Sequence, residues 1–169
     1  MKWKATGFCA GAVAALAVCV AIGAMAASAG TNGAAHGSAN TLAGTWESTI
    51  NPPAPQPPVQ SLQVYNRDGG WGETSNQDPR TRSAMYGSWE RVHDHLYAAT
   101  GIHFLFNPET GAFTGKRKID RTLELSNDGQ TFLVVAKVTT FDTNGNVLGT
   151  FAVRGTGHRL QVERISERP

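Results

Sequence analysis

Cysteine is scarce in this chain and is missing from most of its length. The 169-residue sequence contains two cysteines, Cys9 and Cys19, and both lie in an apolar segment near the N-terminus. The remainder of the chain therefore has neither disulfide bonds to stabilise a small core nor a thiol for nucleophilic or redox chemistry. Its stability must come from buried apolar side chains, for which a chain of this length suffices.

An excess of charge of either sign is also lacking. Of the 15 Lys and Arg residues, Lys2 and Lys4 belong to the N-terminal segment, which leaves 13 against 13 Asp and Glu residues. Proteins that bind nucleic acids usually carry a basic surface that attracts the phosphate backbone. The nearly neutral composition therefore predicts no nucleic-acid partner.

Motifs of catalysis and of cofactor binding are missing as well. No Ser-His-Asp arrangement, phosphate-binding glycine-rich loop or paired-carboxylate motif stands out, so we expect no cofactor and no catalytic residue. His93-Asp94-His95 has the His-x-His spacing that places two imidazoles on one side of a strand, but it lies at an expected turn without a third ligand. We therefore expect no metal site. The sequence carries no indication of oligomeric state.

The N-terminal segment has the three parts of an export signal. Two lysines lie within residues 1–4, residues 5–27 form an almost unbroken apolar run, and Ala24-Met25-Ala26 and Ala27-Ser28-Ala29 are candidate cleavage sites. This pattern predicts a signal peptide over residues 1–29 and an exported protein, either periplasmic or secreted. The alternative is an uncleaved segment that anchors the protein in the inner membrane through residues 5–27, because about 20 apolar residues can span a bilayer.

After the signal, the chain changes to a short polar segment and then to alternating strands. Residues 30–41 are rich in Gly, Ala, Ser, Thr and Asn, which predicts a flexible linker. Residues 42–166 form the predicted domain, and residues 167–169 are a tail. Alternation of apolar and polar residues predicts about nine strands in this domain, at 43–50, 61–65, 71–75, 85–92, 95–106, 112–125, 130–141, 147–154 and 158–165.

The connections between these strands are mostly two to five residues long and rich in Asn, Asp and Gly. Short connections favour a meander, in which neighbouring strands in the sequence pair in the sheet. A meander of eight or nine strands tends to close on itself, because closure removes its edges. We therefore predict an all-β fold, an antiparallel up-and-down β-barrel. An immunoglobulin-type sandwich is the alternative, but its crossovers require longer connections.

Three short motifs carry a resemblance to a known family. Gly44-Thr45-Trp46 opens the domain, Gly87-Ser88-Trp89 lies in mid-chain, and Arg154-Gly155-Thr156 lies near the end. Together with Asp-Gly turns, these motifs resemble the lipocalin, or calycin, group, and more narrowly its exported bacterial lipocalin-like members of uncharacterised function. The resemblance implies a barrel in which Trp46 is covered by an arginine of the last strands, Arg154 or Arg159, and closes one end.

Two arginines on one strand are the leading candidates for ligand contact. Alternation over residues 112–125 places Arg117 and Arg121 on the same face as Phe113, Ile119 and Leu123, which is the interior face. An unpaired arginine inside a barrel is costly. These arginines are therefore paired with an acidic residue such as Glu47, Glu73 or Glu90, or left in water by a shift of register near the rim. The alternative is that they bind the carboxylate or phosphate of a ligand.

Aromatic residues on the presumed inner faces complete the candidate site. In strand 95–106 the face with Ile102, Phe104 and Phe106 is the more apolar, which predicts that Phe104 points inward and His103 outward. The arginines of loop 76–83 are expected to be solvated, because this loop has no apolar anchor. The candidate ligand-binding residues are Arg117, Arg121, Phe104, Phe113 and Tyr86.

The favoured function is a non-catalytic barrel that binds a small hydrophobic or amphiphilic molecule. One alternative is an enzyme of the isomerase or cyclase type built on the same barrel, which requires a titratable group in the interior. The other is a protein-interaction module that uses the Pro-rich loop 51–58, where five prolines favour an extended polyproline conformation.

Overall fold

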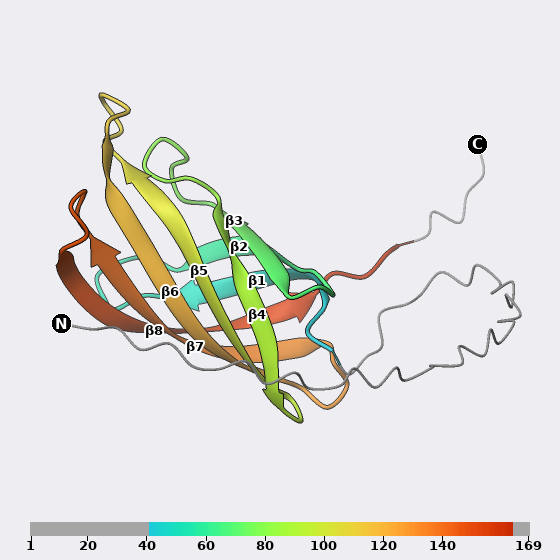
Figure 1. The fold of residues 1–169 in the computed structure, drawn as a ribbon. Coiled ribbons are helices and arrows are strands. Elements are labelled where there is room, and N and C mark those ends of the chain that lie inside the picture. The colour runs from blue at the N-terminus through green and yellow to red at the C-terminus, as the bar shows by residue number, and fades with distance from the viewer. Residues whose placement is uncertain (1–40, 164–169) are drawn as a thin grey trace, which may run out of the picture. The chain divides into compact units, whose positions relative to one another are not determined.

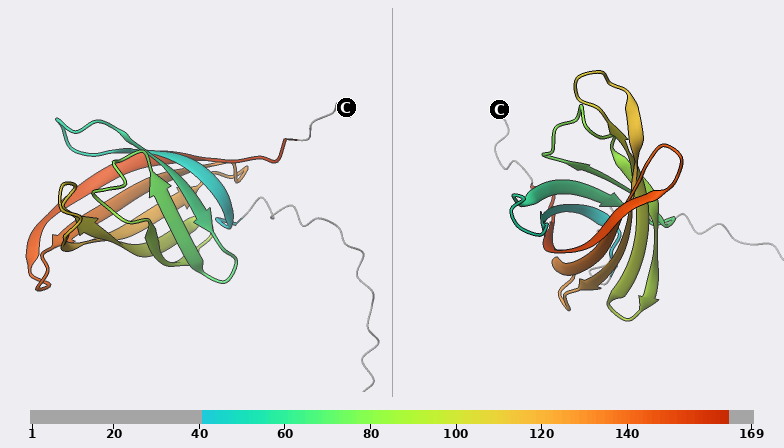
Figure 2. Two further views of the ribbon diagram at one scale, coloured as in Figure 1. Left: turned by 90° about the horizontal axis from the view of Figure 1, so that it is seen from above. Right: turned by 90° about the vertical axis from the view of Figure 1, so that its left-hand side faces the viewer.

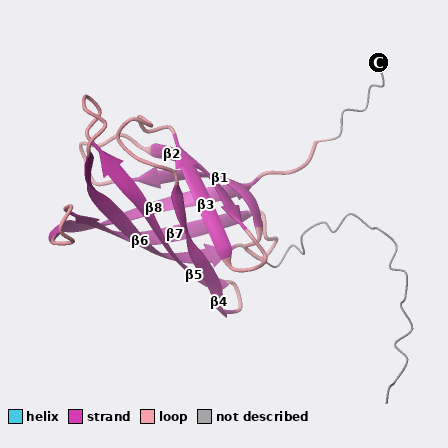
Figure 3. Cartoon of the chain, turned by 45° about the horizontal axis from the view of Figure 1, so that its top comes forward, coloured by secondary structure: helices cyan, strands magenta, loops and turns pink. Residues whose placement is uncertain are grey.

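The structure, a computed structural model, describes residues 41–163. The predicted signal peptide (1–29), linker (30–41, except residue 41) and tail (167–169) lie outside the described residues. Strands are the regular structure of the described part, which contains no helix (Figure 3). These strands are β1 (Gly44–Asn51), β2 (Val59–Tyr65), β3 (Gly70–Ser75), β4 (Met85–His93), β5 (Leu96–Phe106), β6 (Phe113–Leu125), β7 (Thr131–Phe141) and β8 (Val147–Arg159).

Each strand pairs with its neighbours in the sequence, and β8 returns to pair with β1, which closes the sheet into a barrel (Figure 1). All of these pairings are antiparallel. Closure gives every strand two partners and leaves no unpaired edge. The predicted all-β, antiparallel up-and-down barrel is confirmed, and the sandwich alternative is wrong.

The barrel has eight strands rather than about nine because Gly155-Thr156-Gly157 is not a turn. These residues lie inside β8, where Gly155 pairs with Ile50 of β1 and with Val134 of β7. A Cβ atom at Gly155 would collide with the backbone of β1, and one at Gly157 would collide with the ring of Phe132. The glycines therefore allow close packing inside a continuous strand.

The connections alternate between the two ends of the barrel. The loops β1–β2, β3–β4, β5–β6 and β7–β8 extend from one end, which we call the loop end (Figure 2). The other three connections lie at the opposite end, beside the start of β1. The Pro-rich segment forms the β1–β2 connection, so it belongs to the loop end.

Trp46 closes the end opposite the loops. Its side chain is fully buried, its ring packs against Phe132, and its Nε1 donates a hydrogen bond to the carbonyl oxygen of Leu42 at 2.9 Å. The guanidinium of Arg159 lies 4.3 Å from the centre of the Trp46 ring. It also donates hydrogen bonds to the backbone carbonyls of residues 41, 43 and 129. Of the two arginines considered for this position, the structure selects Arg159, and Arg154 is exposed.

The side chains of β6 that point into the barrel are those predicted from the sequence, whereas in β5 the opposite set of side chains points inward. In β6, Ile119, Arg121 and Leu123 are buried, as alternation predicts. In β5 the interior side carries Tyr97, Ala99, Gly101 and His103, while Phe104 is 51% exposed. Large side chains from β3 and β4 occupy the interior beside β5, and a Cβ atom at Gly101 would collide with one of them. Small residues of β5 therefore face inward, although its other face is more apolar.

Candidate functional site

A cavity of about 70 Å³ lies inside the barrel toward the loop end. A single water molecule needs about 10–15 Å³, so this cavity has room for a few waters or for a small chemical group. The residues that line it come from seven strands and two loops: Ile50, Pro52, Gln56, Val59, Glu73, Gln77, Arg82, His103, Arg117, Ile119, Arg121, Ala136, Val138, Phe151 and Val153. The barrel is therefore hollow at this end, and the Pro-rich loop contributes to the wall.

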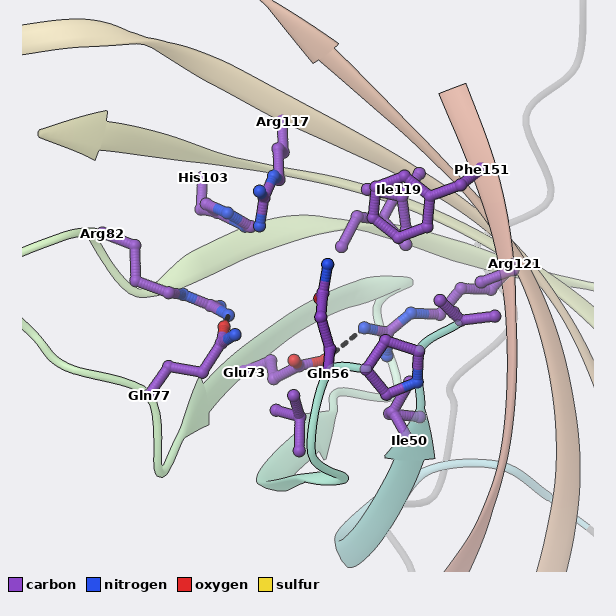
Figure 4. A pocket seen from close by; sticks show the side chains of 15 residues that line it. Ile50, Gln56, Glu73, Gln77, Arg82, His103, Arg117, Ile119, Arg121 and Phe151 are labelled. Atoms are coloured by element: carbon purple, nitrogen blue, oxygen red, sulfur yellow. Dashed lines mark hydrogen bonds and ion pairs between the residues drawn. The ribbon is translucent and has the colours of Figure 1, made fainter. Parts of the chain in front are cut away.

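The cavity has a polar side and an apolar side (Figure 4). Arg82, His103 and Arg117 gather on the polar side, with Gln77 below Arg82. On the opposite side lie apolar residues of β1, β6 and β8, which are Ile50, Ile119 and Phe151. The side chain of Gln56, from the Pro-rich loop, lies between the two sides. A molecule in this cavity would meet Arg82, His103 and Arg117 on one side, and on the other side hydrocarbon together with the ion-paired Arg121.

Arg121 forms a buried ion pair with Glu73 of β3. Its Nη2 donates a hydrogen bond to Glu73 Oε2, and the two side chains are only 3% and 4% exposed. The guanidinium also lies 4.5 Å from the centre of the Trp71 ring. Burial acts to lower the pKa of Arg121, but Glu73 and Tyr65 outweigh this effect and hold the pKa above its ordinary value. Of the three carboxylates proposed from the sequence, Glu73 is the partner, because Glu47 and Glu90 are exposed.

A neighbouring network of polar side chains fills the interior beside β1 and β2. Tyr65 donates a hydrogen bond to Gln63 Oε1 at 2.9 Å, and Gln63 Nε2 donates to Ser48 Oγ at 2.7 Å. Ser48 in turn shares a hydrogen bond with Ser61 at 2.8 Å. Burial raises the pKa of Tyr65 to about 12, so its hydroxyl stays protonated and neutral. These residues form hydrogen bonds with one another, and they add no charge to the barrel interior.

Arg117 lies on the same face of β6 as Arg121, four residues nearer the loop end. Its Nε donates a hydrogen bond to Thr140 Oγ1 at 3.3 Å, and it forms no ion pair with any residue in the described range. Burial lowers its pKa below the ordinary value for arginine. The prediction that Arg117 and Arg121 share the interior face is correct, but within the described residues only Arg121 has an acidic partner.

Arg82 is a residue of the site that the sequence did not indicate. The β3–β4 loop was expected to leave its arginines in water, and for Arg80, which pairs with Asp78 at 2.7 Å, this holds. The segment around Arg82 is instead held against β5, where Ser83 N donates to the carbonyl oxygen of Phe104 at 3.0 Å. Arg82 therefore points into the cavity, and its Nη1 donates to Gln77 Oε1 at 2.7 Å.

His103 also belongs to the cavity, contrary to the prediction that it points outward. Its side chain lies opposite Arg117 in the β5–β6 pairing, and the residue is 1% exposed. Burial, followed by repulsion from Arg82, Arg117 and Arg121, lowers its pKa to about 3. The imidazole is therefore neutral near pH 7, with one nitrogen that donates and one that accepts.

Several buried polar atoms around the cavity lack a hydrogen-bond partner among the described residues. They are Nη2 of Arg82, both ring nitrogens of His103, and Nε and Nη1 of Arg121. Buried polar groups usually have partners, because leaving one without a partner costs about 1–3 kcal/mol. The lining also holds three arginines, which we call the pocket arginines (Arg82, Arg117 and Arg121), against one carboxylate, Glu73. The cavity thus has unused donors and an excess of two positive charges.

The three aromatic residues expected in the site lie on the outside of the barrel. Tyr86 is 71% exposed and Phe104 is 51% exposed, because the interior positions beside them are taken by Met85 and His103. Phe113 is 48% exposed for a different reason. A β-bulge between the Leu105–Gly115 and Phe106–Phe113 pairs shifts the alternation of β6, so Phe113 turns outward and packs against Phe104. The placement of these residues inside the barrel is wrong.

Within the described residues, no group of His, Cys, Asp or Glu side chains is arranged to hold a metal ion, and no helix is long and apolar enough to cross a membrane. Comparison with models of protein families, with curated proteins and with solved structures gave no match. The geometry of the cavity is therefore the basis for a functional assignment.

Proposed function

We propose that this protein is an exported, non-catalytic, lipocalin-like barrel that binds a small amphiphilic molecule with an anionic head group. The observation that carries the proposal is the excess of buried positive charge. Three pocket arginines face one carboxylate, and donors of Arg82 and Arg121 lack acceptors among the described residues. An anion in the cavity would accept a hydrogen bond from the free donor of Arg82, and its negative charge would offset the repulsion among the three arginines.

The apolar side of the cavity supports an amphiphilic ligand rather than a simple ion. Ile50, Ile119 and Phe151 lie opposite Arg82 and His103 (Figure 4), and Val138 and Val153 also line the cavity. Each buried methylene group of a ligand contributes about 0.8 kcal/mol by leaving water. A short hydrocarbon tail next to the head group would therefore add affinity. The Pro-rich loop lies at the loop end, and its residue Gln56 lines the cavity. This position supports a role of the loop in covering the ligand.

The alternatives from the sequence have less support. An isomerase or cyclase needs a general acid or base with a pKa near the working pH. His103 and Glu73 do line the cavity, but the pKa of His103 is near 3 and Glu73 is held in its ion pair with Arg121. A protein-interaction module would be favoured by a solid barrel, whereas the barrel has a cavity at the Pro-rich loop.

Calorimetric titration of the purified protein with hexanoate tests this proposal. We expect saturable binding with one ligand per chain, and Arg117→Leu should weaken it by roughly tenfold or more, because a hydrogen bond to a charged group contributes about 1.5–3 kcal/mol. Lys118→Met is the matched control. It removes one positive charge from the outer face of the same strand, where Lys118 pairs with Asp120. Equal weakening by both variants would contradict the proposal, and so would an absence of saturable binding both by hexanoate and by the phosphate and sulfate esters of hexanol.

A further inference from the structure

We infer that the preferred head group is a phosphate monoester, and that Arg82, His103 and Arg117 bind it while Arg121 stays paired with Glu73. This inference rests on the proposed function, because it names the chemical class of the anion that the cavity accepts. It also assigns different tasks to the three pocket arginines. Arg82 and Arg117 contact the ligand, and Arg121 holds the wall.

Charge balance within the cavity selects a dianion. The described lining residues carry three positive charges and one negative charge, and His103 is neutral near pH 7. A singly charged carboxylate or sulfate ester would leave one positive charge without compensation. A phosphate monoester carries about −1.5 to −2 charges at neutral pH, which matches the excess of two.

Arg121 is the pocket arginine that the structure already holds in an ion pair, although its Nε and Nη1 have no partner among the described residues. Its Nη2 is committed to Glu73, and its guanidinium lies over the Trp71 ring. It is also four residues deeper along β6 than Arg117, which corresponds to roughly 13 Å at about 3.3 Å per residue. Figure 4 shows Arg121 on the opposite side of the cavity from Arg82 and His103. Its charge adds to the attraction for an anion, but its position suits a structural role.

Three polar side chains from three elements of the fold lie on the same side of the cavity. Arg82 comes from the β3–β4 loop, His103 from β5 and Arg117 from β6, and all three gather on the polar side of the cavity (Figure 4). Arg82 Nη2 and the ring nitrogens of His103 are buried without partners in the described structure. A phosphate monoester offers three terminal oxygens, one for each of these side chains, whereas a carboxylate offers two.

The cavity volume also favours a compact head group. A cavity of about 70 Å³ accommodates a tetrahedral anion and part of a tail, but not a bulky ring system together with its substituents. Ile119 lies between Arg117 and Arg121 on the interior face of β6, so a short alkyl chain attached to the phosphate would contact hydrocarbon at once. We therefore expect small alkyl or prenyl-like phosphate esters rather than large phospholipids.

Three ligands that each contain six carbon atoms separate the charge of the head group from its shape. Hexyl phosphate is a dianion above pH 7, hexyl sulfate has the same tetrahedral shape with one charge, and hexanoate is planar with one charge. In calorimetric titrations of the purified protein at pH 7.5, we expect hexyl phosphate to bind roughly tenfold or more tightly than hexyl sulfate, because one more charge-assisted interaction is made. Hexyl sulfate and hexanoate should bind with similar, weaker affinity.

Two variants test the assignment of residues. Arg82→Gln and Arg117→Gln should each reduce the preference for hexyl phosphate over hexyl sulfate to about threefold or less, because each removes one of the two excess charges. Lys118→Met, which acts on the outer face of β6, should leave the preference unchanged. Thermal unfolding identifies any variant that fails to fold. Even then, the preference of the wild-type protein for hexyl phosphate over hexyl sulfate tests the inference of a dianionic head group.

The outcomes distinguish this inference from the proposed function. If hexyl sulfate or hexanoate binds as tightly as hexyl phosphate, the preference for a dianion is refuted and the proposed function stands. If none of the three ligands binds, both are refuted. If Arg82→Gln and Arg117→Gln weaken all three ligands by the same factor and keep the preference, the assignment of these residues as the dianion site is refuted.

Discussion

The buried ion pair between Glu73 and Arg121 leads to a prediction with an unusual asymmetry. In an isolated buried pair, removal of either partner leaves one charge without compensation and costs about 3–5 kcal/mol. Here Glu73 is the single acidic residue among the described residues that line the cavity, which also include three arginines. We therefore expect Glu73→Gln to cost much more stability than Arg121→Met, although the two substitutions break the same contact.

The magnitudes follow from what each substitution leaves behind. Glu73→Gln leaves Arg121 buried and charged beside two other cations, so we expect a loss of about 3–5 kcal/mol in the free energy of unfolding. Arg121→Met leaves Glu73, whose carboxylate also attracts the nearby Arg82. The substitution loses the contact with the Trp71 ring, but a Met sulfur packs well against an aromatic ring. We expect a loss of about 1–2 kcal/mol.

Urea unfolding monitored by tryptophan fluorescence measures these free energies by linear extrapolation. The double variant Glu73→Gln with Arg121→Met should be less destabilised than the sum of the single variants by about 2 kcal/mol or more, because the uncompensated charge is gone. Arg117→Met is the control. Since Arg117 has no acidic partner in the described structure, its removal should change stability by less than about 0.5 kcal/mol or increase it.

Equal destabilisation by the two single variants would contradict this asymmetry. If Arg121→Met destabilises the protein as much as Glu73→Gln, the excess of positive charge does not govern the energetics of the cavity. If the single variants are additive in the double variant, the two side chains do not interact as the structure indicates.

Two further predictions concern pH and the closed end of the barrel. Because burial and the pocket arginines hold the pKa of His103 near 3, below its ordinary value of 6.5, the unfolded chain binds more protons between these values. Stability should therefore rise with pH from about 3 to about 6.5, and His103→Gln should flatten this rise in urea unfolding measured across the same pH range. A pH profile unchanged by the substitution would contradict this. At the closed end, Arg159→Leu should lower the free energy of unfolding by about 2–4 kcal/mol, because it removes the cation over Trp46 and three hydrogen bonds to backbone carbonyls. Arg154→Leu, at an exposed position of the same strand, should change it by less than about 0.5 kcal/mol, and equal effects of the two would argue against the capping role.

Local sequence determined most of the architecture. Alternation of side chains and short turns rich in Asn, Asp and Gly specify antiparallel pairing between neighbours, which closes into the barrel that the structure shows. Alternation along a single strand also placed Arg117 and Arg121 on the interior face, because both side chains lie on one strand with clear apolar neighbours. The extent of β8 was predicted incorrectly, because the sequence alone does not distinguish a glycine that allows close packing within a strand from a glycine in a turn.

The tertiary structure decided which groups meet inside the barrel. Glu73 and Arg121 are separated by 48 residues in the sequence, so their pairing depends on strand register rather than on any local motif. The facing of β5 depends on how much space its neighbours leave, and this placed His103 inside and Phe104 outside. Arg82 entered the cavity because its loop is hydrogen-bonded to β5. Local sequence specifies which residues share a face, but only the packed interior decides which face is buried and which charges lie together.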